Sequence, residues 1–278
     1  MAGLSEQRRR LAAHLRGHGI EIGALHLPLE VPPTAQVTYV DRMPVADLRR
    51  QYVELKDEEL TPVDVLGSAE NLSAFPDGSL DFVIANHLIE HLEDPIRGLA
   101  EFHRVLRRGG LLFLCVPDAR VTFDRHRELT PTDHLLAEHR DPALVSANRR
   151  AHYEDWVANV LGKAEEGFGR PLRPGELEEQ VGHLLRMDYS IHIHCWNAAT
   201  FRSFFRAACR EAGLGFAILD WTDTVPLGQN ELVLLAAREP KLGQRLRIRA
   251  GPRLKERVKA SPAGPGLTRL RRRLRGQN

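Results

Sequence analysis

Cysteine and long apolar runs are scarce in this chain of 278 residues, and each shortage excludes a class of protein. Three cysteines that are widely spaced and odd in number do not make a disulfide framework. No wholly apolar run exceeds Leu111–Val116, which is far shorter than the roughly 20 residues of a membrane span. The first ten residues are charged and lack the apolar stretch of a secretory signal. We therefore expect a soluble, cytoplasmic protein.

Positive charge is concentrated at one end of the chain. Residues 238–278 contain 14 Lys and Arg against two Glu, a net charge of +12, which leaves −10 for the preceding 237 residues because the whole chain has +2. The run SPAGPG (Ser261–Gly266) suits neither helix nor strand. We place a domain at residues 1–238 and a basic, flexible tail at 239–278.

The tail permits more than one interpretation. Leu267, Leu270 and Leu274 have the spacing of one helical face and are surrounded by arginines. Such a helix could bind an anionic membrane surface, which would make the protein peripheral to the membrane, or it could be a solvated extension. Nucleic acid is an unlikely partner, because a nucleic-acid-binding fold carries its basic stripe on the folded surface and this body is acidic. Nothing in the sequence indicates an oligomeric state.

Apolar strand-like segments alternate with helical connections in the body, which predicts a parallel sheet covered on both faces. A helix is expected over Asp94–Leu106, ending at Gly109 and Gly110. The last two strands are separated by a short turn-rich segment, so we expect them to be antiparallel neighbours. The predicted strands are Gly19–Gly23, Val37–Asp41, Val63–Gly67, Leu80–Asn86, Leu111–Pro117, Phe216–Trp221 and Glu231–Ala237.

An open parallel sheet binds its ligand at the carboxyl ends of its strands, so the residues just after each strand are the first candidates for a site. The first three strands are followed by acidic, small and hydroxyl side chains, and the fourth by an amide and an imidazole. These candidates are Glu21, Gly23, Ala24, Asp41, Ser68, Ala69, Glu70, Asn86 and His87.

The stretch SAENLSAFPDGSLDFVIANHLIEHLEDPIRGLAEFHRVLRRGGLLFLCVPD (Ser68–Asp118) resembles the class I S-adenosylmethionine-dependent methyltransferases of the small-molecule branch. The resemblance covers Gly19–Asp118 and resumes over Phe216–Ala237. The first motif, EIGALH, is similar to that of a bacterial subgroup associated with cell-surface glycan assembly. The resemblance to this family implies a Rossmann-like α/β fold with a mostly parallel seven-stranded sheet, an antiparallel last strand and a helical lid insertion between strands five and six.

The resemblance also implies a cofactor, S-adenosyl-L-methionine, and roles for the strand-end residues. Gly23, with Glu21 and Ala24, matches the motif that lets the backbone approach the methionine end, and Asp41 matches the acidic residue that binds the ribose hydroxyls. Ser68, Ala69 and Glu70 match the adenine segment, while Asn86 and His87 flank the reactive end. Two departures stand out: one glycine remains of the usual glycine-rich loop, and Ser68 replaces a common aspartate.

The segment from about residue 119 to 195 is longer than a minimal fold needs, and we interpret it as a lid that selects the substrate. Arg125, Arg127 and His134 follow the fifth strand closely and could bind an acidic or polyhydroxylated substrate. A solvated linker with ordinary salt bridges is the alternative. For removal of the acceptor's proton we select His126 and His87, since imidazole titrates near neutral pH.

His192 and His194 alternate in YSIHIHCW, which predicts a strand that presents both rings on the face turned to the pocket, where they would bind substrate. With Cys195 they resemble part of a metal site, but no third ligand is close in the sequence, so we expect none.

The leading hypothesis is a methyltransferase that acts on an O or N atom of a polar small molecule or glycan precursor. Two alternatives remain: an enzyme that uses the same cofactor for a non-methylating reaction, or a non-catalytic scaffold with this fold.

Overall fold

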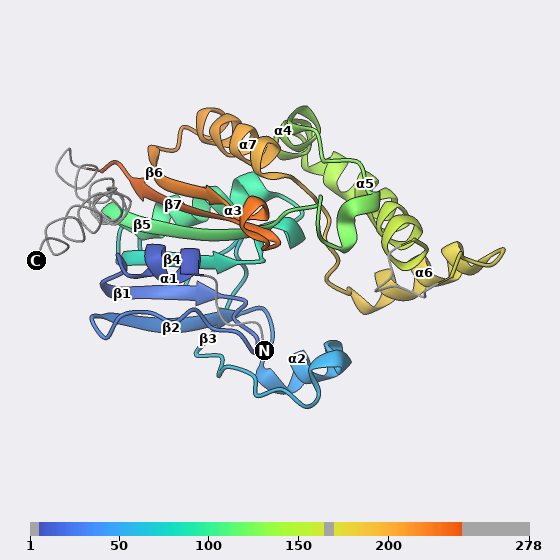
Figure 1. The fold of residues 1–278 in the computed structure, drawn as a ribbon, viewed down its shortest axis with the longest axis horizontal. Helices are drawn as coiled ribbons and strands as arrows, with labels where there is room; N and C mark the ends of the chain where they lie inside the picture. The colour runs from blue at the N-terminus through green and yellow to red at the C-terminus, as the bar shows by residue number, and fades with distance from the viewer. Residues whose placement is uncertain (1–5, 164–169, 241–278) are drawn as a thin grey trace, which may run out of the picture. The chain divides into compact units, whose positions relative to one another are not determined.

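A seven-stranded sheet forms the centre of the computed structural model, which describes residues 6–163 and 170–240 (Figure 1). Its strand order is β3-β2-β1-β4-β5-β7-β6. Only β7 runs against the others, since it pairs antiparallel with both β5 and β6. The predicted fold class is therefore confirmed. The strands are β1 (Gly17–Ile22), β2 (Ala35–Asp41), β3 (Val65–Leu66), β4 (Leu80–Asn86), β5 (Leu106–Pro117), β6 (Phe216–Asp223) and β7 (Glu231–Arg238).

The junction between α3 (Pro95–Val105) and β5 differs from the prediction. The helix ends at Val105 and the strand begins at Leu106, so Gly109 and Gly110 lie within β5. Leu106 already pairs with Leu80 of β4, and the register shifts before Leu111 pairs with Phe82. Gly109 has a φ of 80°, a conformation that glycine adopts without strain. The two glycines thus belong to an irregularity in the strand.

Helices cover both faces of the sheet, as a sheet that is buried on both sides requires. Side chains at alternate positions of β4, β5 and β7, such as Val83 and Leu114, pack in one core with Phe102 of α3 and Phe201 of α7 (Ala198–Glu211). Side chains on the opposite face, such as Phe113, are also fully buried, and α1 (Glu6–Ala12) contacts β7.

The segment between β5 and α7 is mainly helical and lies beyond the carboxyl ends of the parallel strands (Figure 1). An extended stretch without regular structure connects its last helix to α7, so the predicted strand at His192 and His194 is wrong. The only ladder contact there is a single bridge between Trp196 and Asp118. The elements are a 3-10 turn (Phe123–His126), α4 (Thr132–Arg140), α5 (Pro142–Trp156), a π-helical turn (Val157–Leu161) and α6 (Glu176–Met187).

The predicted tail lies outside the described residues from position 241 onward, so its helix is not tested. Among residues 6–163 and 170–240, no helix has both the length and the apolar character needed to cross a bilayer.

Candidate functional site

A cavity of about 350 Å³ opens where the parallel strands end, at the position that the sheet topology predicts for a ligand. Its volume falls within the usual range for a small-molecule site, about 300–1,000 Å³. The walls come from the ends of β1, β2, β3 and β4, from Tyr52, which follows α2 (Val45–Gln51), and from the lid insertion. Its lining includes Gly23, Asp41, Arg42, Tyr52, Ser68, Ala69, Glu70, His87, His91, Arg149, Tyr153, Asp188 and Tyr189.

Five of the eight predicted cofactor-binding residues line this cavity: Gly23, Asp41, Ser68, Ala69 and Glu70. Gly23 has a φ of 70°, and a Cβ atom added there would lie 3.3 Å from the Leu88 Cδ1 atom and fill part of the space. Asp41 is 9% exposed at the end of β2, and its Oδ1 atom accepts a hydrogen bond of 2.7 Å from the amide of Arg42. Burial raises the pKa of Asp41 although backbone amides oppose the shift. These features fit a cofactor with ribose hydroxyls near Asp41 and a narrow chain near Gly23.

The other three, Glu21, Ala24 and Asn86, do not line the cavity. The buried Glu21 carboxylate accepts hydrogen bonds from the Leu29 amide at 3.1 and 3.0 Å and from Asn86 Nδ2 at 3.2 Å. Glu21 thereby holds the loop that lacks the usual glycines, and Leu25 in that loop adopts a left-handed φ of 47°. Burial raises the pKa of Glu21 to about 7 despite these hydrogen bonds. Glu21 therefore supports the loop, and Leu25 lines the cavity instead of Ala24.

The lid insertion contributes one wall of the cavity through residues that the sequence did not single out. Asp188, in the left-handed region at φ 49°, forms ion pairs with Arg42 at 3.2 Å and with Arg149 of α5. Gln51 Nε2 donates to the Asp188 carbonyl at 2.9 Å. The Tyr189 ring, whose centroid is 6.2 Å from that of Tyr52, continues the wall. Asp188 thus joins the lid to β2 and α2, across the mouth of the cleft.

His87 lines the cavity and is the predicted base that lies where the methyl donor's reactive end is expected. It has an unusual φ of 47°, which is costly for a residue with a Cβ atom and is typical of functional sites. Its Nε2 atom lies 2.9 Å from Glu231 Oε2, and Glu231 is also paired with Arg8. Burial alone would raise the pKa of Glu231, but the hydrogen bonds from His87 and Arg8 lower it to about 2. Glu231 is therefore ionised and orients the His87 ring.

The predicted base His126 and the predicted substrate residues after β5 lie elsewhere. His126 is exposed at the end of its 3-10 turn and is not part of the cavity lining. Arg125 is half-buried and donates to the Thr122 carbonyl at 3.3 Å. Arg127 is buried; it pairs with Asp124 at 2.9 Å and donates to the backbone carbonyls of residues 192 and 193. Arg127 therefore fastens the chain after β5 to the end of the lid.

His192 and His194, expected on one strand face, belong to separate groups. His192 Nδ1 lies 2.6 Å from Asp124 Oδ2, and its ring is next to His91 at a centroid distance of 4.7 Å. His194 is fully buried, with ring contacts to His134 and His152 at 6.4 and 5.4 Å. Neither ring lines the cavity, because extended backbone without a sheet partner is free to rotate each side chain toward its own neighbours.

Burial and neighbouring histidines keep the deepest imidazoles neutral. Burial, followed by the nearby His192, lowers the pKa of His91 well below its ordinary value. Burial also lowers the pKa of His192, in spite of the hydrogen bond to Asp124. The same desolvation raises the pKa of Glu90 well above its ordinary value, and the carboxylates of Asp124 and Glu231 add to the effect. Burial thus disfavours the charged form of each of these three side chains.

The sheet topology, with a glycine just after β1 and an acidic residue at the end of β2, is that of a Rossmann-like methyltransferase fold. In a comparison with known proteins, residues 17–114 match the family model described as a methyltransferase domain. Residues 17–114 are therefore similar to the class I S-adenosylmethionine-dependent methyltransferases, a family whose cofactor is S-adenosyl-L-methionine.

Curated relatives share this part of the chain. A "probable S-adenosylmethionine-dependent methyltransferase" of Mycolicibacterium smegmatis is 31% identical over 127 residues, which is 42% of this chain and 48% of that protein. One of the same description from Mycobacterium tuberculosis is 36% identical over 114 residues, 38% of this chain and 37% of its own length. The chain spans less than half the length of these relatives. A solved SAM-dependent methyltransferase of Methanosarcina mazei is 16% identical, with 86% of this chain and 99% of that chain covered and a TM-score of 0.44.

Proposed function

We propose that the protein transfers a methyl group from S-adenosylmethionine to an oxygen or nitrogen atom of a polar small molecule or glycan precursor. The observation that carries this proposal is the cavity itself. Gly23, Asp41 and the Ser68–Glu70 segment, which come from three strands, line one continuous space together with His87.

The residues that would hold the cofactor follow from this geometry. The Asp41 carboxylate would accept hydrogen bonds from the ribose hydroxyls, and the Ser68–Glu70 segment would lie along the adenine. Gly23 leaves room for the methionine part. Once bound, the cofactor supplies a methyl group that is already activated by its positively charged sulfur. The protein then has to position the acceptor and to remove its proton.

His87 suits the removal of that proton. Because Glu231 is ionised, it accepts a hydrogen bond from Nε2–H of His87, which leaves a lone pair on Nδ1. This pairing of a carboxylate with an imidazole orients a general base in many enzymes. The His87 side chain is half-buried beside the Glu231 carboxylate, a polar setting that favours a hydroxyl or amine acceptor. The cytoplasmic location and contact of the tail with an anionic membrane surface stay predictions from the sequence.

Titration calorimetry with S-adenosylmethionine and S-adenosylhomocysteine tests this proposal directly. We expect micromolar binding of at least one of them to the wild type. Asp41→Ala should weaken binding by one or two charge-assisted hydrogen bonds, each worth about 1.5–3 kcal/mol. Asp57→Ala, at an exposed position outside the cavity, is the matched control and should bind as the wild type does. Unchanged affinity in Asp41→Ala would refute the ribose assignment. Absence of binding of both compounds to the wild type would refute the proposal that the protein is a methyltransferase.

A further inference from the structure

Three side chains with metal-ligating atoms meet immediately beside the cofactor cleft. They are Glu90 and His91, which follow β4, and His192, which ends the lid insertion. One ligand atom from each lies within 4.8 Å of the other two. His91 lines the cleft, whereas Glu90 is fully buried. The fold thus brings two ligands from a distant segment to His192, whereas His194 and Cys195 are not part of this group.

Both imidazoles are oriented as metal ligands usually are. His192 Nδ1 is 2.6 Å from the Asp124 carboxylate, and His91 Nδ1 is 2.8 Å from the Ile191 carbonyl. Carboxylates and carbonyls only accept hydrogen bonds, so each Nδ1 carries the proton and each neutral ring keeps a lone pair on Nε2. Histidines that bind metals commonly donate their other N–H to such a carboxylate or carbonyl, which fixes the ring.

Glu90 lacks the partners that a buried carboxylate normally has. Neither of its oxygens makes a hydrogen bond. Its Oε1 atom lies 3.9 Å from His192 Nε2 and 3.8 Å from His87 Nδ1, which is too long for a hydrogen bond. Among residues 6–163 and 170–240, no arginine or lysine forms an ion pair with it that would offset its charge. A bound cation would compensate this carboxylate, and small inward shifts would bring all three ligands to it.

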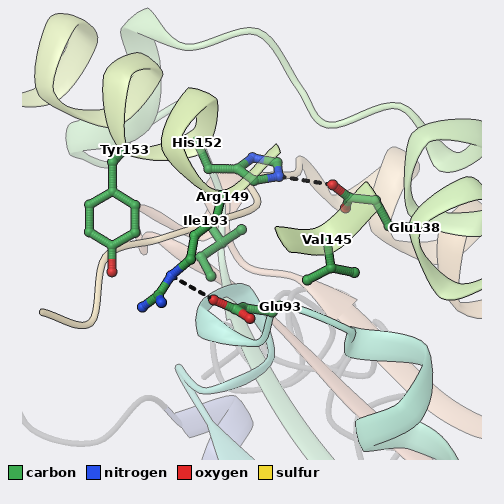
Figure 2. A pocket seen from close by; sticks show the side chains of 7 residues that line it. All are labelled: Glu93, Glu138, Val145, Arg149, His152, Tyr153 and Ile193. Atoms are coloured by element: carbon green, nitrogen blue, oxygen red, sulfur yellow. Dashed lines mark hydrogen bonds and ion pairs between the residues drawn. The ribbon is translucent and has the colours of Figure 1, made fainter. Parts of the chain in front are cut away.

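A second group of the same composition, His134, Glu138 and His152, provides a contrast. There the carboxylate has partners: Asn148 and His152 lie 3.0 and 3.1 Å from Glu138 Oε1, and His134 lies 3.2 Å from Oε2. Figure 2 shows the His152–Glu138 contact at a cavity of only about 10 Å³, which shares the lining residues Arg149, Tyr153 and Ile193 with the cleft. One oxygen of this carboxylate thus has two hydrogen-bond partners, and the other has no hydrogen bond but lies beside His134, so Glu138 is more completely paired than Glu90.

We propose that Glu90, His91 and His192 bind one divalent transition-metal ion at the edge of the cofactor cleft. Imidazole ligands favour such an ion over Mg²⁺, and two histidines with one carboxylate leave coordination positions open. Because His91 lines the cleft, the open coordination positions of the ion would face the cleft. There the ion would hold an acceptor hydroxyl and polarise its oxygen. This role rests on the proposed methyl transfer, whereas the binding of the ion does not depend on it. An oxygen acceptor follows from this role.

Metal titration of the full chain tests the site without any cofactor or acceptor. The protein is stripped with a chelator, desalted and titrated calorimetrically with Zn²⁺ and separately with Mg²⁺. We expect one Zn²⁺ per chain and weaker binding of Mg²⁺. Glu90→Gln should weaken Zn²⁺ binding by at least about 100-fold, because it removes a direct ligand. Glu138→Gln is the matched control and should leave the affinity unchanged.

Three results would overturn the proposal: no Zn²⁺ binding to the wild type, equal affinity in Glu90→Gln, or loss of binding in Glu138→Gln alone. His91→Asn provides a second variant if Glu90→Gln does not fold, because the asparagine amide can still donate to the Ile191 carbonyl while the Nε2 ligand is gone. It should also weaken Zn²⁺ binding by at least about 100-fold. If Zn²⁺ does not bind but S-adenosylmethionine does, the metal site fails and the proposed methyl transfer is unaffected.

Discussion

Glu21 should give the folded protein a pH dependence that a single substitution removes. Its carboxyl is 1% exposed, and burial raises its pKa from 4.5 to about 7. A carboxyl with a raised pKa keeps its proton in the folded state over a range in which the unfolded chain has lost it. The folded state is then favoured at low pH, and this contribution is lost as the pH rises through the folded pKa.

The magnitude follows from the shift. A difference of one pKa unit corresponds to about 1.4 kcal/mol, so the full shift from 4.5 to about 7 is worth about 3.5 kcal/mol. Between pH 5 and pH 8, where most of the transition falls, the free energy of unfolding should decrease by about 2.5 kcal/mol through Glu21 alone. Glu21→Gln does not titrate, and its side-chain carbonyl can still accept a hydrogen bond from the Leu29 amide.

The assay is urea denaturation of the wild type and Glu21→Gln at pH 5, 6, 7 and 8, without cofactor. From pH 5 to pH 8, the unfolding free energy of the wild type should decrease by about 2.5 kcal/mol relative to that of Glu21→Gln. Glu30→Gln is the control, because Glu30 is exposed in the same loop, and its difference from the wild type should stay constant. A difference for Glu21→Gln that also stays constant would show that the carboxyl is ionised in the folded state, which would refute the reasoning.

Two further predictions concern the histidines and the buried arginine. In a methyl-transfer assay, His87→Ala should lower kcat at least tenfold while cofactor affinity stays within a few-fold, because a general base contributes about 10²–10⁴-fold. His126→Ala, at an exposed position, should retain wild-type turnover. The reverse order of effects would restore His126 as the base. Arg127→Ala should destabilise the fold by about 3–5 kcal/mol in urea denaturation, because it leaves the buried Asp124 carboxylate without its cation. A loss below 1 kcal/mol would show that the buried ion pair is dispensable.

The strands and the main caps of this fold can be predicted from the sequence because their signals are local. The apolar run of β4 matches its predicted bounds, Leu80–Asn86. Asp94 caps α3 by accepting hydrogen bonds from the amides of Ile96 and Arg97. Asn197 and Thr200 form a reciprocal capping box at the start of α7, as their spacing indicates. Each of these features depends on residues within a few positions of one another.

The candidate site could be predicted only in part, because several of its contacts join residues that are far apart in the chain. The cofactor residues follow strand ends and are found from topology alone. The lid residue His192 is not found this way, because it meets Asp124 across 68 positions. The pair beside His87 is also missed, because Arg8 of α1 meets Glu231 of β7 across 223 positions. Sequence spacing gives no direction to a side chain on extended backbone or in a short turn, so His126 could not be told from a residue that points inward.

The distribution of buried acids around the cleft indicates what kind of ligand it has to accommodate. Asp124 and Glu231 are each balanced by an arginine, Arg127 and Arg8. Glu21 and Glu90 form no ion pair with lysine or arginine in the described part of the chain, and both are raised in pKa by burial. Glu21 is supported by hydrogen bonds to the loop beneath the cleft, but Glu90 has none. A carboxyl without partners adds nothing to folding, since an apolar side chain would cost less to bury. Its presence at the cleft edge is therefore best explained by a cationic ligand, which is the requirement that a bound metal ion would meet.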